Sequence, residues 1–356
     1  MTIGRRNVVA VAGVTLVLSG IAASARAADL PAAVRSAAPA DEFKAPIGKY
    51  VSEQLARVAG SDPKAAGQAR DELYKQVEST QVFTPSASFQ TIYVSAVLSN
   101  IGNLQNSPDV LVRLNAAIIV CKLCDATGLS QLSDPVLKAL NDPSPAVCLW
   151  GMKATKSLLP PVLAVPLNQQ NQKLTPAMVA AVKSHHDIAS LVQDAYDALT
   201  LPLTPPSPAS ALNLTASTSC DILNIRIADY KTGVAANPLV DNTPLLYVSR
   251  SDVIQAMTPA LRVKAVQAVC DLLVVCVRRA ATTPPGSGRD DLYNLASRSA
   301  GGLSVMLSGT PAAGQFAGLG KLPGASTGKE IIDNTVAAVR ALSSTPEYKA
   351  IKPLAE

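Results

Sequence analysis

Six cysteines are the most reactive side chains in this sequence of 356 residues, and two of them stand as a pair. Cys121 and Cys124 form a C-x-x-C, the spacing of thiol redox centres and of half a zinc site. A redox pair starts a helix, whose dipole lowers the thiol pKa, whereas this pair lies deep in a helix predicted over 108–124. A second zinc pair is missing, because Cys270 and Cys276 do not share a helix face. We interpret the cysteines as buried apolar residues, with a redox or metal role for Cys121 and Cys124 as the alternative.

The two histidines of the chain are neighbours in the sequence His185-His186-Asp187. Adjacent side chains point in different directions, and no carboxylate stands at the spacing of a helical zinc motif. We predict an exposed turn between two helices here, with Asp187 capping the start of the second helix. A metal-binding or catalytic role for this turn is the alternative.

The segment 318–330 has the residue types of a phosphate-binding loop but not its spacing. Its last two glycines stand one residue too close together, and Glu330 takes the place at which Ser or Thr binds Mg²⁺. Thr327 and Glu330 instead have the spacing of a capping box at the start of the last helix. Ser304 lacks the second glycine of a nucleophile elbow. None of these motifs predicts catalysis, so we expect a protein that is not an enzyme and uses no cofactor or metal.

The first 27 residues have the pattern of a secretory signal peptide. A positive start precedes an apolar stretch over 8–23, and small residues follow at Ala25 and Ala27. We expect cleavage before Ala28 and an exported protein, periplasmic or secreted, with a retained membrane anchor as the alternative. Export permits disulfides, for which Cys148 is one candidate.

The charge balance points away from nucleic acid as a partner. The chain has 31 basic and 26 acidic residues, and the signal removes three arginines and no acid, which leaves the mature protein nearly neutral. Nucleic-acid binding needs clustered Lys and Arg, and the sequence has no such cluster. After removal of the signal we expect no integral membrane segment, since charged and polar residues interrupt the apolar stretch 260–280.

The elements that position these residues are predicted to be helices. Seven of these helices are expected to start at a pair in which an oxygen-bearing residue stands directly before Pro. The side-chain oxygen can accept a hydrogen bond from a free backbone N–H at the helix start, and Pro has no N–H to leave unpaired there. These pairs are Asp62-Pro63, Thr84-Pro85, Ser107-Pro108, Asp134-Pro135, Asp142-Pro143, Thr175-Pro176 and Thr258-Pro259. Apolar residues at helical spacing predict helices over 47–59, 63–78, 85–104, 108–124, 135–140, 143–159, 176–184, 187–199, 210–232, 249–256, 259–280, 289–307 and 328–343.

Prolines and small residues interrupt this pattern of helices. The interruption with the most prolines, at 201–209, predicts a linker. The composition, with many Ala, Leu and Val and 4% aromatic residues, favours closely packed helices over buried strands. The predicted organisation is a signal peptide over 1–27, an extended lead-in over 28–46, helical repeats over 47–200, a proline-rich linker over 201–209 and a helical region over 210–356.

Two of the predicted helix starts are nearly the same, 35 residues apart. The alignment pairs Asn106 with Asn141, Pro108 with Pro143, Val112 with Val147, and Leu114 with Leu149. Self-similarity of this period is typical of a solenoid, and the short helix at 135–140 makes each unit an antiparallel helix pair. The segment 109–124 is apolar nearly all round, so neighbouring units must cover it, and we expect Ile118 to lie in that core.

The second copy, DPSPAVCLWGMKAT, resembles the second helix of a HEAT repeat, in which a turn with Asp and Pro leads to Val, Arg and then Ala. The first copy has Arg113, but Ser107 stands where Asp is usual. The second copy has Asp142, but Cys148 stands where Arg is usual. Neither copy therefore carries both members of the Asp–Arg ladder that joins HEAT repeats.

The resemblance covers residues 85–200, with Gly151 opposite Ala116 as a further departure. It implies a curved α-solenoid that serves as a scaffold or binding surface, and it transfers no catalytic residue. We therefore expect an all-α, HEAT-like solenoid that binds another protein or a component of the cell envelope. An enzyme whose site no motif marks is the alternative.

Overall fold

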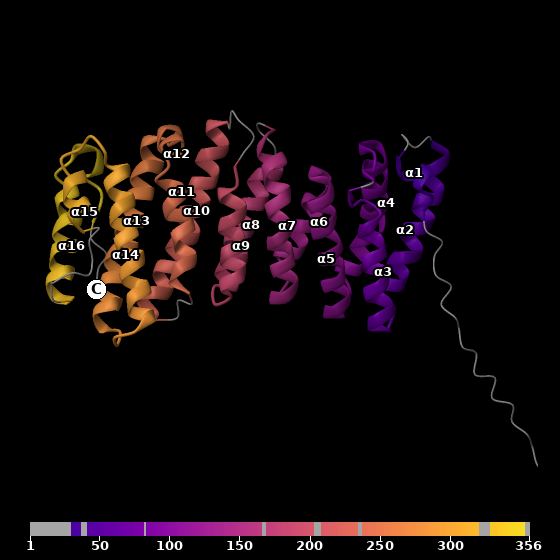
Figure 1. Cartoon of the computed structure of the whole chain (residues 1–356), viewed down its shortest axis with the longest axis horizontal. Helices are drawn as coiled ribbons and strands as arrows, with labels where there is room; N and C mark the ends of the chain where they lie inside the picture. Colours follow the sequence, from indigo (N-terminus) through magenta and orange to yellow (C-terminus); the bar gives the residue numbers. More distant parts are fainter. Residues whose placement is uncertain are drawn as a thin grey trace, which may run out of the picture.

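The computed structural model describes residues 30–36, 41–81, 83–165, 169–202, 208–233, 237–319 and 328–352. Their secondary structure consists of 16 α-helices and four short 3-10 turns, which confirms the all-α prediction. Figure 1 shows the helices side by side in a long row that follows the order of the sequence. In the part of the chain that the structure describes, every helix is too short or too polar to span a bilayer.

Most of the predicted helices are present, with bounds that lie within a few residues of those predicted from the sequence. The helices are α1 Ala32–Ser36, α2 Lys44–Val58, α3 Pro63–Lys75, α4 Ala87–Gln105, α5 Val110–Thr127, α6 Ser133–Leu140, α7 Pro145–Leu163, α8 Gln169–Ser184, α9 Ala189–Thr200, α10 Ala209–Thr232, α11 Asn242–Val248, α12 Ser251–Ala256, α13 Pro259–Thr282, α14 Ser287–Met306, α15 Ala313–Leu319 and α16 Gly328–Leu342. The 3-10 turns are η1 Asp41–Phe43, η2 Ser130–Leu132, η3 Pro238–Asp241 and η4 Pro346–Tyr348.

The helices pack in two layers that alternate along the chain. The first layer is formed by α2, α4, α6, α8, α10, α13 and α16, each in contact with the next. The second layer is formed by α3, α5, α7, α9, α11 and α14, again in sequential contact. Each second-layer helix also packs on its first-layer partner, so the chain is a stack of antiparallel helix pairs. This arrangement continues through the C-terminal half, where the sequence shows no repeat.

The two copies of the sequence repeat occupy equivalent places in neighbouring units. Asp142, in the turn that leads into α7, is bound by Arg113 in the first turn of α5. Further along both helices, the Ser157 hydroxyl donates to Asp125 Oδ1 at 2.6 Å. Since start meets start and end meets end, α5 and α7 run parallel, and α6 packs against both. The predicted relation between these three helices is confirmed.

An Asp–Arg pair does join the two copies, with the Arg from the first copy and the Asp from the second. Arg113 Nε donates to Asp142 Oδ2 at 2.7 Å, and its Nη2 donates to Oδ1 at 3.3 Å. The Arg of one unit thus binds the Asp of the next, although neither unit carries both residues. The same guanidinium donates to the Ser107 and Pro108 carbonyls, which ties the two turns together.

The predicted helix starts are right at some prolines and displaced at others. Asp62 and Thr258 cap α3 and α13, accepting hydrogen bonds from the Lys64 and Leu261 N–H groups. At α4 and α5 the cap moves two residues later, to Ser86 and Asp109. The chain had a second oxygen-bearing residue available after each Pro, and that residue is the one that reaches the free N–H groups.

Prolines misplaced the end of one predicted helix, 143–159, and the start of another, 176–184. The structure continues α7 through Pro160 and Pro161 to Leu163, and α8 begins before Pro176. Pro inside a helix removes a backbone hydrogen bond, but packing outweighs that loss here because Leu158 and Val162 are fully buried.

Other departures concern short elements and the residues between them. The lead-in expected to be extended over 28–46 contains α1 and η1, and α2 already begins at Lys44. Helices α11 and α15 were not predicted. The signal peptide over 1–27 lies outside the described residues, as do 203–207 of the linker, whose role as a domain boundary stays a prediction. Helices α8 and α9 pack directly on α10 across it.

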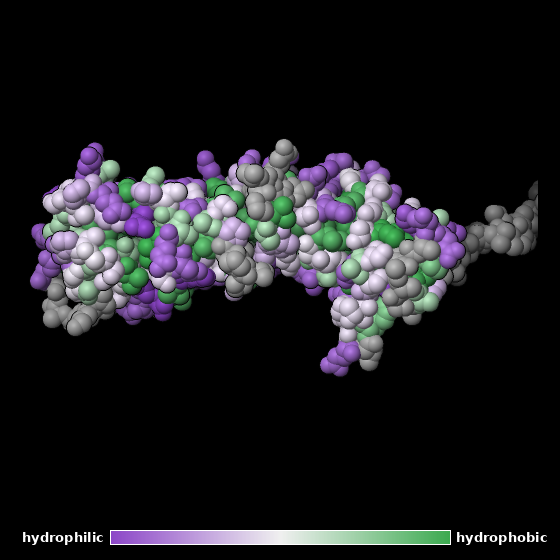
Figure 2. Space-filling model, turned by 90° about the horizontal axis from the view of Figure 1, so that it is seen from above, coloured by the Kyte–Doolittle hydropathy of each residue, from purple (hydrophilic) through white to green (hydrophobic). Residues whose placement is uncertain are grey.

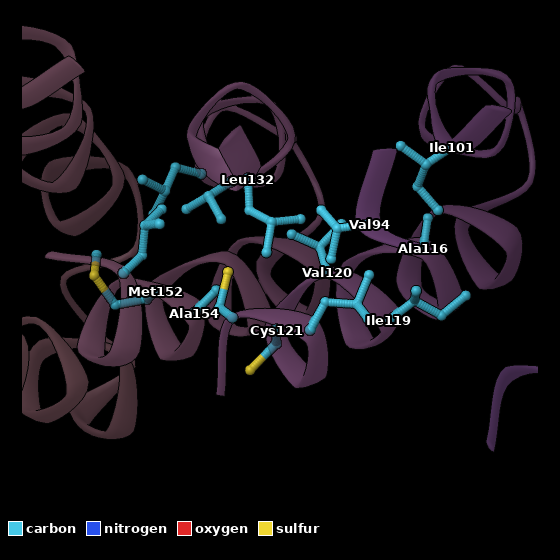
Figure 3. Close-up of a cluster of buried hydrophobic side chains, with 14 of the residues drawn as sticks. Val94, Ile101, Ala116, Ile119, Val120, Cys121, Leu132, Met152 and Ala154 are labelled. Atoms are coloured by element: carbon cyan, nitrogen blue, oxygen red, sulfur yellow. The ribbon is translucent and has the colours of Figure 1, made fainter. Parts of the chain in front are cut away.

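Two hydrophobic clusters fill the space between the layers and meet on α10. The N-terminal cluster extends from Leu30 to Ile222 and includes Val240, and the C-terminal cluster extends from Leu212 to Ile351. Figure 3 shows part of the first, where side chains of α4, α5, η2 and α7 converge. Ile119 of α5 is fully buried, whereas Ile118, which we expected in the core, is only half-buried.

Gly151 allows α7 to approach α6 closely. A Cβ atom at this position would lie 2.8 Å from the Leu140 nitrogen and 2.9 Å from the Ala139 carbonyl carbon. Both are backbone atoms and cannot move without shifting α6. The departure from Ala in the repeat alignment therefore has a steric cause.

Gly151→Ala is expected to destabilise the protein by about 1–3 kcal/mol, because the added methyl separates α6 from α7. The matched control is Gly102→Ala in α4, where a Cβ meets nothing within 4 Å. That control should instead stabilise by up to about 1 kcal/mol through helix propensity. Urea unfolding of both variants measures the difference, and equal effects of the two substitutions would contradict the close approach.

Candidate functional site

The cysteine pair is part of the core between units. Cys121 and Cys124 lie in the second half of α5, and both are buried. Burial raises the pKa of Cys121 to about 12 and raises the pKa of Cys124 well above its usual value. Thiols with such pKa values are protonated at neutral pH, which leaves little of the thiolate that redox chemistry and metal binding require.

The other four cysteines are equally enclosed. All six are buried and present as free thiols in the structure. Burial raises the pKa of Cys148 and of Cys220 to about 12. The Cys148 thiol donates to the Leu140 carbonyl across the contact between α7 and α6. These observations favour the interpretation of the cysteines as packing residues.

The histidine turn connects α8 and α9 as predicted, but His185 and His186 are half-buried rather than exposed, and Asp187 does not cap α9. The N-cap residue is Ile188, and no side chain accepts a hydrogen bond at this start. Asp187 is exposed. The two histidines diverge: His186 turns toward α10, where its Nδ1 lies 2.8 Å from Asp229 Oδ1, and His185 borders a surface hollow.

That hollow brings together residue types that catalysis can use. It has a volume of about 260 Å³ and lies between the ends of α6 and α8, with Asp142, Ser184 and His185 in its lining. Asp142, however, is already occupied by the Arg113 guanidinium and by the Ser144 N–H at 2.8 Å. The carboxylate that could orient a histidine is therefore committed to the contact between units.

A buried ionic cluster lies where the two halves of the stack meet. Arg226 of α10 and Asp241 of η3 are both completely buried. Arg226 Nε donates to both Asp241 oxygens, at 3.3 and 3.1 Å, and Nη2 lies 3.1 Å from Oδ2. The Tyr196 and Tyr230 hydroxyls donate to the same carboxylate, at 3.0 and 2.6 Å. One carboxylate thus joins α9, α10 and η3.

Two further members of the cluster, Asp229 and His186, lie between the buried pair and the surface. Asp229, one turn beyond Arg226 on α10, lies 3.6 Å from its Nη1 and also contacts His186. Arg226 Nη1 donates to the His186 carbonyl at 3.5 Å. His186 is the partly exposed member, and the chain from His186 to Asp241 runs inward from the solvent.

Burial dominates the electrostatics of the inner pair. It raises the pKa of Asp241, while Arg226 and the two tyrosine hydroxyls act in the opposite direction. Burial also raises the pKa of Tyr196 and of Tyr230. The hydroxyls therefore keep their protons and serve as donors. The arrangement is suited to holding three helical elements in one register, because Arg226 and the two tyrosine hydroxyls all donate to the Asp241 carboxylate.

Little in the sequence predicts this cluster. Arg226 and Asp241 are separated in the chain, and Tyr196 lies on a helix before the predicted linker. The one signal is local: Arg226 stands between Ile225 and Ile227 in an otherwise apolar turn. A charged residue there needs a buried partner, but the sequence cannot identify which acid supplies it.

A second hollow, larger than the one beside His185, lies on the outer side of the first layer. It has a volume of about 530 Å³ between α2 and α4, with Lys44 and Gly48 on one side and hydroxyl side chains of α4 on the other. Thr91, Ser95 and Ser99 each donate their hydroxyl proton to the carbonyl four residues earlier. The wall of this groove is therefore polar in composition but satisfied by its own helix.

The other residues that the sequence suggested as candidates lie in helix turns or in ion pairs within the fold. Asp290 lies in the first turn of α14, Asp291 follows it directly, and Ser304 lies in the last turn. Asp71 and Glu72 are paired with Arg70 and Arg57. Residues 320–327, which include most of the glycine-rich segment and Thr327 of the predicted capping box, lie outside the described residues.

Asp271 of α13 gives the stability a pH dependence. Burial raises its pKa to about 6, so the charged carboxylate costs free energy in the folded state above that pH. The cost disappears as the pH falls through 6 toward the unfolded value near 4. Asp271→Asn should therefore stabilise the protein at pH 8, by about 1–2 kcal/mol after discounting for partial exposure, and progressively less toward pH 4.

Unfolding by urea at several pH values measures this effect. Asp252→Asn is the control with the opposite sign, because the Arg250 guanidinium holds the pKa of Asp252 below its usual value. That variant should lose a little stability at neutral pH. A gain for Asp271→Asn that does not change with pH would contradict the assignment to ionisation.

Comparison with known proteins adds no relative: no protein-family model and no curated protein matches the chain.

Proposed function

We propose that the protein is a non-catalytic, exported scaffold of HEAT-like repeats that binds another protein or a component of the cell envelope. The observation that carries the proposal is the continuous two-layer stack of helix pairs, which offers a long surface in place of a deep cavity. The Arg113–Asp142 bridge between successive units supports the HEAT type of repeat.

The groove between α2 and α4 is the part of this surface best suited to a partner. It is open and wide, and its wall needs no hydrogen bonds from a partner. Figure 2, which looks onto the stack from above, shows apolar residues in small patches separated by polar ones. No single apolar face dominates that view, which favours a partner held by shape and by scattered contacts.

A photo-reactive amino acid at Ser95 tests the proposal in intact cells. We expect a discrete crosslinked product from Ser95, and none from the same probe at Asn334, an exposed residue of α16 at the far end of the stack. Gly48→Gln should reduce the product, because a side chain at Gly48 projects into open space beside the groove. Equal crosslinking from Ser95 and Asn334 would contradict a partner in this groove.

Export is tested by the N-terminus of the mature protein. N-terminal sequencing of protein from the cell envelope or medium should begin at or near Ala28. A cytoplasmic protein that retains Met1 would contradict the export part of the proposal.

The second candidate function is an enzyme, and the hollow beside His185 is the observation that favours it. If His185 and Ser184 act there, His185→Gln and Ser184→Ala should each abolish a measurable turnover while leaving the fold intact. The scaffold proposal expects both variants to retain the biological activity and the Ser95 crosslink. Loss of activity in both, with unchanged thermal stability, would favour the enzyme.

A further inference from the structure

The groove between α2 and α4 has a row of side-chain oxygens along one wall. Thr91, Ser95 and Ser99 recur every four residues on α4, and all three are exposed and line the groove. Each hydroxyl donates its one proton to the carbonyl four residues earlier, at 2.9, 2.8 and 3.0 Å. A hydroxyl oxygen also has two acceptor lone pairs, which this bond does not use. These three side chains therefore offer a partner acceptors rather than donors.

The rest of the lining is apolar or carries little net charge. Ile92 and Ala96, each one residue beyond a hydroxyl of the row, are half-buried and give the groove an apolar strip. Among the described lining residues Lys44 is the charged one, and its Nζ lies 2.6 Å from Asp41 Oδ1. An acceptor row beside an apolar strip suits a partner with neutral hydrogen-bond donors and small or apolar side chains.

The spacing of the row matches that of an extended peptide. Residues four apart on an α-helix are separated by about 6 Å along its axis. On an extended chain, the N–H groups that point to one side recur every second residue, about 6.6–6.8 Å apart. With the middle N–H placed at Ser95, the mismatch at Thr91 and Ser99 is under about 1 Å. Three alternate N–H groups of a segment of about five residues can therefore reach the three oxygens.

Hydrogen bonds of this kind already occur on other first-layer helices of the chain. Asn213 Oδ1 on α10 accepts from the Thr258 N–H at 3.0 Å, and Gln267 Oε1 on α13 accepts from the Lys352 N–H at 3.1 Å. In both cases a side-chain oxygen on a helix holds the backbone of a residue that lies outside the helices. A helical partner would not use the row in this way, because its own N–H groups are bonded within its helix.

We propose that the groove between α2 and α4 binds an extended peptide segment of a partner protein, whose alternate backbone N–H groups donate to Thr91, Ser95 and Ser99. The side chains on the inner face of that segment pack on Ile92 and Ala96. This inference rests on the proposed function and makes it more specific, because it gives the chemistry and the conformation of what the scaffold binds.

A library of acetylated and amidated heptapeptides, selected on the purified full-length mature chain, tests the proposal. Fluorescence polarisation then gives the affinity of the tightest-binding heptapeptide. Methylation of one backbone nitrogen at a time should weaken binding about tenfold at three alternate positions, because each loses a hydrogen bond to the row. Methylation at the positions between them should change the affinity less than about twofold.

Substitutions in the groove test the same contact from the side of the protein. Thr91→Ala with Ser95→Ala removes two acceptors from an exposed helix face and should weaken peptide binding about tenfold. The matched control is Thr232→Ala with Ser343→Ala, at exposed residues whose hydroxyls also donate to carbonyls of their own helices, and it should bind as the wild type does. Thermal melts confirm that both double variants are folded.

The proposal is overturned if no heptapeptide binds, if the effect of methylation does not alternate, or if the variant in the groove binds as tightly as its control. Binding of chitohexaose in place of peptides, lost in the groove variant, would assign the groove to a glycan instead. The Ser95 crosslink in cells is read separately. A crosslink without the alternation keeps the scaffold proposal and rejects the extended peptide, so the two failures are distinguishable.

Discussion

Replacing Arg226 by Met is expected to lower the free energy of unfolding by about 3–5 kcal/mol, because it leaves the Asp241 carboxylate buried without a charged partner. Asp241 is completely buried, and the Tyr196 and Tyr230 hydroxyls alone cannot compensate its charge. Urea unfolding followed by far-ultraviolet circular dichroism measures the loss. The exposed pair Arg250–Asp252 provides the control, since Arg250→Met should cost less than about 1 kcal/mol.

The double variant of the buried pair separates the charge from the packing. Arg226→Met with Asp241→Leu removes both charges and should recover much of the loss, although the tyrosine hydroxyls then lose their acceptor. If the double variant is less stable than Arg226→Met alone, the cluster stabilises by shape and hydrogen bonding rather than by charge compensation. A small loss for Arg226→Met itself would mean that water reaches the cluster.

Truncating Ile119 to Ala is the second large effect, with an expected loss of about 2–5 kcal/mol. Ile119 is completely buried between the layers, so the shorter side chain leaves a cavity. Cys124→Ala, also completely buried on α5, removes less volume and should cost about 0.5–1.5 kcal/mol. Thermal and urea unfolding of both variants give this order if the thiol is a packing residue.

A functional thiol predicts the reverse order of consequences. Cys124→Ala would then abolish activity or metal content, while Ile119→Ala would only weaken the fold. Thiol titration of the native protein adds an independent measurement: the buried thiols should react slowly and together, as unfolding exposes them. One fast-reacting thiol, or stoichiometric zinc, would contradict the packing interpretation.

The order of helices could be predicted because the sequence marks their starts locally. Asp62 and Thr258 cap the helices that they were expected to cap, and the pairing of Val112 with Val147 correctly placed two units side by side. The same local rules failed at Pro160 and Pro176, where packing sustains a helix through a residue that weakens it. Propensity is a local quantity, whereas burial of a helix face depends on the neighbours in the stack.

The ionic cluster and the groove depend on contacts between helices, and no motif in the sequence marks these contacts. Arg226, Asp241 and Tyr196 meet only because α9, α10 and η3 pack together. The C-terminal half shows no sequence repeat, and its second-layer helices α11 and α14 begin at Asn242 and Ser287, 45 residues apart, which differs from the 35 residues between the two aligned copies. The groove between α2 and α4 likewise follows from how two helices diverge, and no motif marks it.

The sharing of α10 by two hydrophobic clusters has a consequence for how the molecule comes apart. Ala211 and Ile222 of this helix belong to the N-terminal cluster, while Ala216 and Cys220 belong to the C-terminal one. In a linear stack each unit is stabilised chiefly by its neighbours, so fraying at either tip is a local event that leaves the rest standing. Unfolding of α10 has a different effect from fraying at a tip, because it removes buried contacts from both clusters at once. The helix in the middle of the chain is therefore the element that makes unfolding of the two halves a single cooperative event.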